Sequence, residues 1–285
     1  MIKHTQTIFR GMGQVMFQNN VYSGILFFAG IFYNSWILGL AALFGTVIST
    51  VTAMILKYPE EDIQNGLYGF NGALTGIAML FYFGFNPVTI VALIIGAVCS
   101  SLLMHGVKKL IPPFTAPFVV VTWVLIILLL FVFHSKLITG VESPSERLSI
   151  LAATTNGFGQ VMFQKNMVTG LFFLLAILIN SRLFALYSLY ASLLGLLLGW
   201  LLSVPLTALN GGLMGYNGIL CAIALAGTKR GNFKWVSLAV ILSVLLNMGF
   251  NKMGMIALTA PFVLSTWIML AVKSKVIGIK RVNRI

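Results

Sequence analysis

Long apolar runs alternate with short polar connectors along the whole chain. Such runs are typical of helices that cross a membrane. Each half of the chain holds five of them, so the pattern predicts an all-α fold with ten transmembrane helices. The predicted spans are about Val21–Tyr33, Trp36–Leu56, Leu67–Phe83, Pro87–Met104, Val119–Phe133, Met167–Ile179, Leu183–Val204, Leu213–Ala226, Trp235–Met248 and Pro261–Val272.

Composition supports a membrane location. Of the 285 residues, 59% are hydrophobic and only 8% are charged. A soluble domain of this size needs far more charge to cover its surface, so we expect a polytopic protein in a lipid bilayer. The segment Met1–Thr7 does not lead into an apolar stretch with a cleavage site, and no processed form is predicted.

Three motifs of the first half recur in the second half in the same order, which indicates an internal duplication. Two recur at a spacing of 146 residues and the third at 144. The pairs are Gly13–Gln18 with Gly159–Gln164, Tyr68–Gly72 with Met214–Gly218, and Thr115–Phe118 with Thr259–Phe262. We therefore expect two repeats, residues 1–140 and 141–285.

An odd number of spans in each repeat predicts that the two repeats are inverted. If the chain starts inside, fourteen of its eighteen basic residues fall on the cytoplasmic side, as the positive-inside rule requires. Those fourteen are Lys3, Arg10, Lys57, Lys108, Lys109, Arg182, Lys229, Arg230, Lys234, Lys273, Lys275, Lys280, Arg281 and Arg284. We expect both termini in the cytoplasm and a bacterial plasma (inner) membrane location. The net charge of +13 is then explained by the orientation of the chain in the membrane, and we expect no nucleic-acid partner.

The repeated Thr-Ala-Pro-Phe motif predicts a broken backbone. Proline lacks an N–H group and disfavours helix in the residue before it. Broken backbone at membrane depth is tolerated only where it faces protein or a cavity. Matching breaks in two inverted repeats point to a midplane site between them, so we predict re-entrant pore segments near 105–118 and 249–262.

Charged and catalytic groups are not predicted inside the spans. The acids Glu60, Glu61, Asp62, Glu142 and Glu146 all fall in loops, which favours passive movement of an uncharged solute. The sequence shows no nucleophile–base constellation and no ligand spacing around its histidines and cysteines. We therefore expect neither an enzyme nor a metal or other cofactor.

The polar and aromatic groups near the motifs are duplicated. The polar pairs are Gln14 and Gln160, Asn71 and Asn217, and Thr115 and Thr259; the aromatic pairs are Phe17 and Phe163, Phe70 and Tyr216, and Phe118 and Phe262. Aromatic faces beside free backbone carbonyls suit a small, planar, neutral amide. The same aromatics also fit ordinary packing, the threonines fit bonds to their own helices, and the asparagines fit helix caps.

These motifs resemble the urea transporter family. Gly-Gln-Val-Met-Phe-Gln, Tyr-Gly-Phe-Asn and a Pro-x-x-Thr-x-Pro-Phe break occur in the first half and recur, some of them approximately, in the second. The resemblance implies an inverted-repeat homotrimer with one pore per subunit and channel-like flow of urea down its gradient. It also implies an aromatic slot at each mouth and threonines at the constriction.

The resemblance carries onto particular residues of this chain. One slot would be Phe17 with Phe70, and the other Phe163 with Tyr216, whose hydroxyl adds a hydrogen bond or narrows the slot. The full implied pore set is Gln14, Val15, Phe17, Phe70, Asn71, Leu74, Thr115, Phe118, Gln160, Val161, Phe163, Tyr216, Asn217, Leu220, Thr259 and Phe262. Here Leu74 and Leu220 would be apolar walls of the constriction. Taken singly, both leucines also fit an ordinary role in the hydrophobic core.

Other functions remain open. A membrane-embedded enzyme or receptor lacks support, because the chain shows neither catalytic clusters nor an attached soluble domain. A channel for ammonia, water or another simple amide is a closer alternative. Paired histidines would favour ammonia and Asn-Pro-Ala breaks would favour water, but the breaks here read Thr-Ala-Pro.

Overall fold

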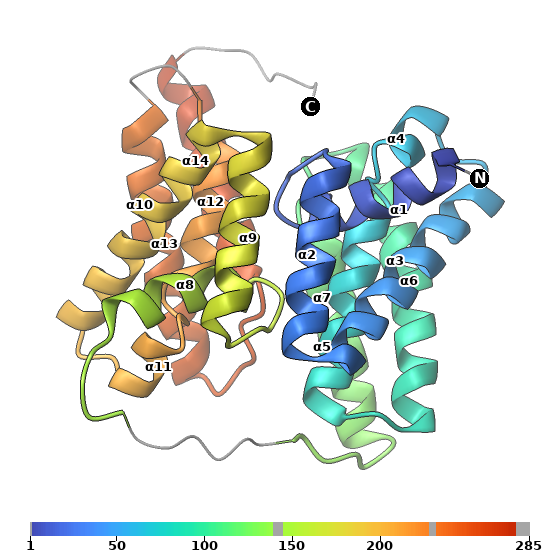
Figure 1. The fold of residues 1–285 in the computed structure, drawn as a ribbon, viewed down its shortest axis with the longest axis horizontal. Helices are drawn as coiled ribbons and strands as arrows, with labels where there is room; N and C mark the ends of the chain where they lie inside the picture. Colours follow the sequence, from blue (N-terminus) through green and yellow to red (C-terminus); the bar gives the residue numbers. More distant parts are fainter. Residues whose placement is uncertain (1, 139–144, 228–231, 278–285) are drawn as a thin grey trace. The chain divides into compact units, whose positions relative to one another are not determined.

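The computed structural model describes residues 2–138, 145–227 and 232–277, and these residues form helices and connecting turns without a β-strand (Figure 1). The chain divides into two compact units, Met1–Val141 and Glu142–Ile285. The first unit contains α1 (Ile2–Gln14), α2 (Val21–Asn34), α3 (Trp36–Ile55), α4 (Glu60–Gln64), α5 (Gly69–Phe83), α6 (Pro87–Lys108) and α7 (Ala116–Phe131). The second contains α8 (Ile150–Gln160), α9 (Met167–Asn180), α10 (Arg182–Leu201), α11 (Leu206–Asn210), α12 (Tyr216–Leu225), α13 (Asn232–Lys252) and α14 (Ala260–Ile277).

Each of the ten predicted spans corresponds to a helix. The match is closest where a polar cap marks the boundary of an apolar run. At the start of α2, for example, the N-cap Asn20 accepts hydrogen bonds from two backbone amides of the first turn. Four of the described helices, α3, α6, α10 and α13, are long and apolar enough to cross a membrane. Five shorter helices are also apolar, so an all-helical membrane architecture is confirmed, while the count of ten crossings stays a prediction.

Two helices that the hydrophobic pattern did not predict, α1 and α8, occupy matching places in the two units. They contain 13 and 11 residues, equivalent to about 20 and 17 Å of helix, against about 30 Å for the hydrocarbon core. Each is followed by a tight turn and packs against the next helix, α2 or α9. The hydrophobic pattern does not reveal α1 and α8, because polar residues and glycines interrupt their apolar residues.

The predicted re-entrant segments cover the ends of α6 and α13 and the turns that follow them, and their re-entrant path stays a prediction. In the first unit α6 continues to Lys108, and only residues 109–115 form turns before α7 begins. In the second unit α13 continues to Lys252, and residues 253–259 precede α14. The interruptions contain residues that disfavour helix, Pro112 and Pro113 in the first unit and Gly254 in the second. We call these two interruptions the breaks.

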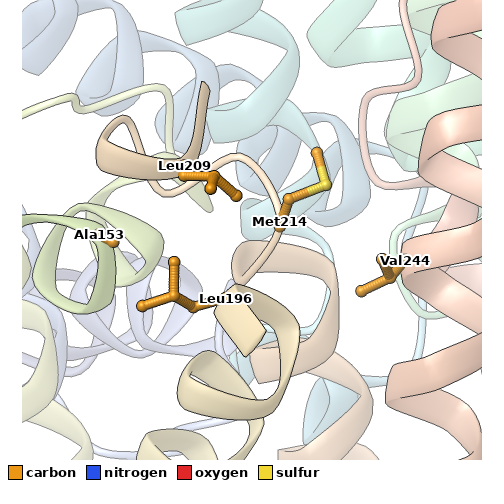
Figure 2. Close-up of a cluster of buried hydrophobic side chains, with 5 residues drawn as sticks. All are labelled: Ala153, Leu196, Leu209, Met214 and Val244. Atoms are coloured by element: carbon orange, nitrogen blue, oxygen red, sulfur yellow. The ribbon is translucent and has the colours of Figure 1, made fainter. Parts of the chain in front are cut away.

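A buried apolar cluster anchors the short elements of the second unit to its long helices (Figure 2). It consists of Ala153 of α8, Leu196 of α10, Leu209 of α11, Met214 just before α12, and Val244 of α13. Because burying a leucine, methionine or valine side chain is favourable by about 1.5–3 kcal/mol each, the cluster stabilises the packing of α8 and α11 against the long helices of the unit.

Candidate permeation site

Each break contains a residue in the left-handed backbone conformation directly before its threonine. Phe114 has φ 47° and Leu258 has φ 48°. Residues with side chains seldom adopt this conformation, and one that does is held there by its surroundings. Thr115 and Thr259 follow, both buried, and α7 and α14 begin at the next residue. The two units therefore build the same strained turn in front of a helix.

Asn71 and Asn217 cap the helices that follow the breaks. The Phe118 N–H donates to Asn71 Oδ1 at 3.1 Å, and the Phe262 N–H donates to Asn217 Oδ1 at 3.2 Å. These amides belong to the first turn, which has no acceptor within its own helix. The structure thus supports the capping role for both asparagines, with the cap supplied by the neighbouring α5 or α12.

Leu74 and Leu220 lie three residues after these asparagines and are completely buried. Residues three apart share one face of a helix. Because Asn71 and Asn217 face the starts of α7 and α14, both leucines lie on the side of α5 or α12 that faces those starts. This placement is compatible with an apolar wall beside each threonine.

The repeated Gly-Gln-Val-Met-Phe-Gln motif ends the short helices α1 and α8. Phe17 and Phe163 have φ 58° and 61°. In the first unit the Gln18 N–H donates to the Gly13 carbonyl at 3.0 Å and the Phe17 N–H donates to the Gln14 carbonyl at 3.0 Å. The second unit repeats both bonds, and together they define a Schellman C-cap. A phenylalanine occupies the left-handed position that such caps usually give to glycine.

The side chains around this motif divide into buried and accessible groups. Val15, Val161, Phe118 and Phe262 are fully or almost fully buried. Phe17, Phe163, Gln14 and Gln160 remain partly exposed within their own units. Phe70 and Tyr216, which were also expected at the mouths, are buried, and the lining of the mouths stays a prediction.

The first unit brings Phe17 to its break. The Phe17 and Phe114 ring centroids lie 5.9 Å apart with the rings nearly perpendicular, a favourable edge-to-face geometry. Phe70 is buried beside Asn71 on α5. One ring that packs against Phe17 is Phe114, and a slot formed by Phe17 with Phe70 stays a prediction.

The second unit has a tyrosine contact in place of that ring pair. Leu258 occupies the position before Thr259, and the Tyr216 hydroxyl donates to its carbonyl oxygen at 2.6 Å. The hydroxyl therefore bonds to the backbone of the break.

Comparison with known proteins decides the family. The model of the family described as "Urea transporter" matches residues 5–274. The chain is also 34% identical over 241 residues to "Urea transporter 1" of Rattus norvegicus, with 77% of this chain and 62% of that protein covered. The same protein of Mus musculus matches at 34% and that of Ovis aries at 33%, with the same coverage. The chain belongs to the urea transporter family. It spans about 62% of the length of these relatives.

In this urea transporter family member, sequence reasoning missed the support given by α4 and α11. Gln14 Nε2 donates to the Asn65 carbonyl at 2.9 Å, and Arg10 donates to the Gln64 carbonyl at 3.2 Å. In the second unit Asn156 Nδ2 donates to the Asn210 carbonyl at 2.8 Å. These bonds hold α1 and α8 to the short helices next to them. A usable signal was the matching amide pair Gln64 and Asn210 at a spacing of 146 residues.

Proposed function

We propose that this protein lets urea permeate the membrane passively, down its gradient. The proposal rests on one observation above all, the pair of breaks in a chain of the urea transporter family. Each break sets a buried threonine between a left-handed residue and a helix capped by asparagine. The relatives named "Urea transporter 1" point to the same solute.

The chemistry of the breaks suits urea. Urea is planar and neutral, with four N–H donors and one carbonyl acceptor. Threonine hydroxyls both donate and accept, and interrupted helices leave carbonyl oxygens to accept N–H groups. Aromatic faces such as those of Phe17 and Phe163 exclude water without competing for hydrogen bonds. The site therefore offers partners to the edges of the solute and apolar surface to its faces.

The position of charged groups supports a neutral solute and the absence of ion coupling. Residues 253–259 contain no charged side chain, and residues 109–115 contain one, Lys109, which lies at the C-cap of α6. Of the acids in the described residues, Glu60, Glu61 and Asp62 lie on α4 and Glu146 lies before α8. Asp62 is paired with Lys108. Glu142 and the basic residues Lys229, Arg230, Lys280, Arg281 and Arg284 lie outside the described residues.

The finer architecture of the proposal follows from the sequence. From the sequence, we take the two units as inverted repeats and the sixteen predicted pore residues as the lining of one pore. The re-entrant pore segments are those predicted near 105–118 and 249–262, which contain the two breaks. The assembly is a homotrimer in a bacterial inner membrane, with both termini in the cytoplasm.

Flux into proteoliposomes tests the function. Purified protein should raise urea entry above that of empty vesicles, and neither a proton nor a sodium gradient should change the rate. Glycerol, ammonium and water are measured in parallel, because permeation of one of these without urea would favour the alternative channels. Urea entry equal to that of empty vesicles would refute the proposal.

Replacement of the threonines tests the site. Thr115→Val and Thr259→Val keep the side-chain shape but remove a hydroxyl, so we expect each to lower urea flux roughly fivefold, the equivalent of one neutral hydrogen bond. Thr52→Val is the matched control, because the Thr52 hydroxyl bonds to the Ile48 carbonyl of its own helix α3. Wild-type flux in both threonine variants would contradict the assignment of Thr115 and Thr259 to the site.

A further inference from the structure

The two units hold their breaks by different contacts. In the first, the ring of Phe114 packs against Phe17. In the second, Leu258 replaces that ring and its carbonyl accepts the hydrogen bond from Tyr216. The residue that matches Tyr216 in the first unit is Phe70, which carries no hydroxyl. One hydroxyl group therefore distinguishes how the second break is held.

The bond from Tyr216 to Leu258 is the main one that this hydroxyl makes. Its oxygen lies 2.6 Å from the Leu258 carbonyl but 3.4 Å from Asn247 Oδ1, which is long for a bond between two oxygens. Asn247 is itself oriented, because its Nδ2 donates to the Leu213 carbonyl at 3.0 Å. The hydroxyl therefore adds a hydrogen bond, and it donates that bond to the backbone of the break.

Two neighbouring residues of α12 form hydrogen bonds with the backbone of the second break, one before Thr259 and one after it. Tyr216 holds the carbonyl of the preceding residue, Leu258, and Asn217 holds the amide of Phe262 in the following turn. Both bonds are buried. Because the backbone is fixed just before and just after Thr259, the position of its hydroxyl is set by α12.

We propose that Tyr216 is a positioning residue that determines solute specificity in the second unit, by fixing the Leu258 carbonyl and with it the aperture at Thr259. The inference rests on the urea permeation proposed above. A threonine held from two sides selects one size of solute. Loss of the hydroxyl frees the break to move and releases a carbonyl acceptor, so a bulkier amide gains access.

Tyr216→Phe is the test, with methylurea and urea flux measured in the same proteoliposomes. The methylurea-to-urea flux ratio should rise about threefold to fivefold, the range expected from one buried hydrogen bond. Hydrogen exchange of the backbone amides in residues 253–259 should speed up in the same variant. Tyr190→Phe is the matched control, because the Tyr190 hydroxyl bonds to Ser237 on α13, away from the break. It should change neither readout.

The reciprocal variant, Phe70→Tyr, adds a hydroxyl at the matching position of the first unit and should lower the flux ratio. Faster exchange in Tyr216→Phe without a change in the ratio would overturn the specificity role, leaving the tyrosine merely structural. Unchanged exchange would overturn the positioning role. Wild-type vesicles without urea flux would instead refute the proposed function, and the exchange measurement would still decide the positioning role.

Discussion

Among glycine-to-alanine substitutions, Gly24→Ala and Gly170→Ala are expected to cause the largest loss of folded protein. A Cβ atom at Gly24 would lie 1.8 Å from the Phe9 carbonyl oxygen, and one at Gly170 would lie 1.9 Å from the Thr155 carbonyl oxygen. Both obstacles are backbone atoms, so the helices must separate. Overpacking of this kind costs about 3 kcal/mol, the upper end of the usual range. Because α1 and α8 carry Gln14 and Gln160, their displacement should also abolish urea flux.

The measurement is the fraction of protein that stays monodisperse after heating in detergent, followed by urea flux of the surviving material. Gly106→Ala and Gly249→Ala are the matched controls, because an added Cβ at either position has no neighbouring heavy atom within 4 Å. Both lie inside helices, where alanine is favoured over glycine by about 0.5–1 kcal/mol. Wild-type heat resistance in Gly24→Ala would contradict the close contact between α1 and α2.

Asn71→Leu and Asn217→Leu should give the second largest loss. Leucine fills a similar volume but offers no acceptor to the Phe118 or Phe262 amide. Removing a buried partner of this kind costs about 1–3 kcal/mol. The start of α7 or α14 then shifts together with the threonine before it, so we expect urea flux to fall by about tenfold or more, the equivalent of 1.4 kcal/mol.

The control for this pair is Asn180→Leu, the same change at the exposed end of α9, which should alter stability by less than about 0.5 kcal/mol. Flux and heat resistance are measured as for the glycine variants. Asparagine variants that conduct urea like the wild type would show that the two caps do not position the threonines.

The apolar helices were predictable because their signal is local. A run such as Val21–Tyr33 is bounded by polar caps, and the structure places α2 over nearly the same residues. By contrast, α1 and α8 depend on close packing against α2 and α9, through glycines that lie 15 residues from the backbone they contact. A single sequence does not display such contacts, so the half-length helices were missed.

The candidate site was predictable as a set of residue types and less so as a set of contacts. The duplicated motifs singled out Asn217 and Tyr216, but capping and solute binding fitted the asparagine equally well. The bond from Tyr216 to Leu258 joins residues 42 positions apart, and no local pattern encodes it. Similarly, the packing of Phe17 against Phe114 was not predicted, and the slot of Phe17 with Phe70 that the resemblance implies stays a prediction.

The left-handed Phe17 and Phe163 have a consequence for engineering this protein. A side chain in that conformation costs roughly 1–2 kcal/mol, which glycine would not incur. Glycine at either position would relieve this strain but would also remove the ring, and at Phe17 it would remove the favourable contact with Phe114, so we expect no gain in heat resistance from the exchange. The same strain occurs at matching positions of both units, and it agrees with the predicted need for an aromatic ring at each pore mouth.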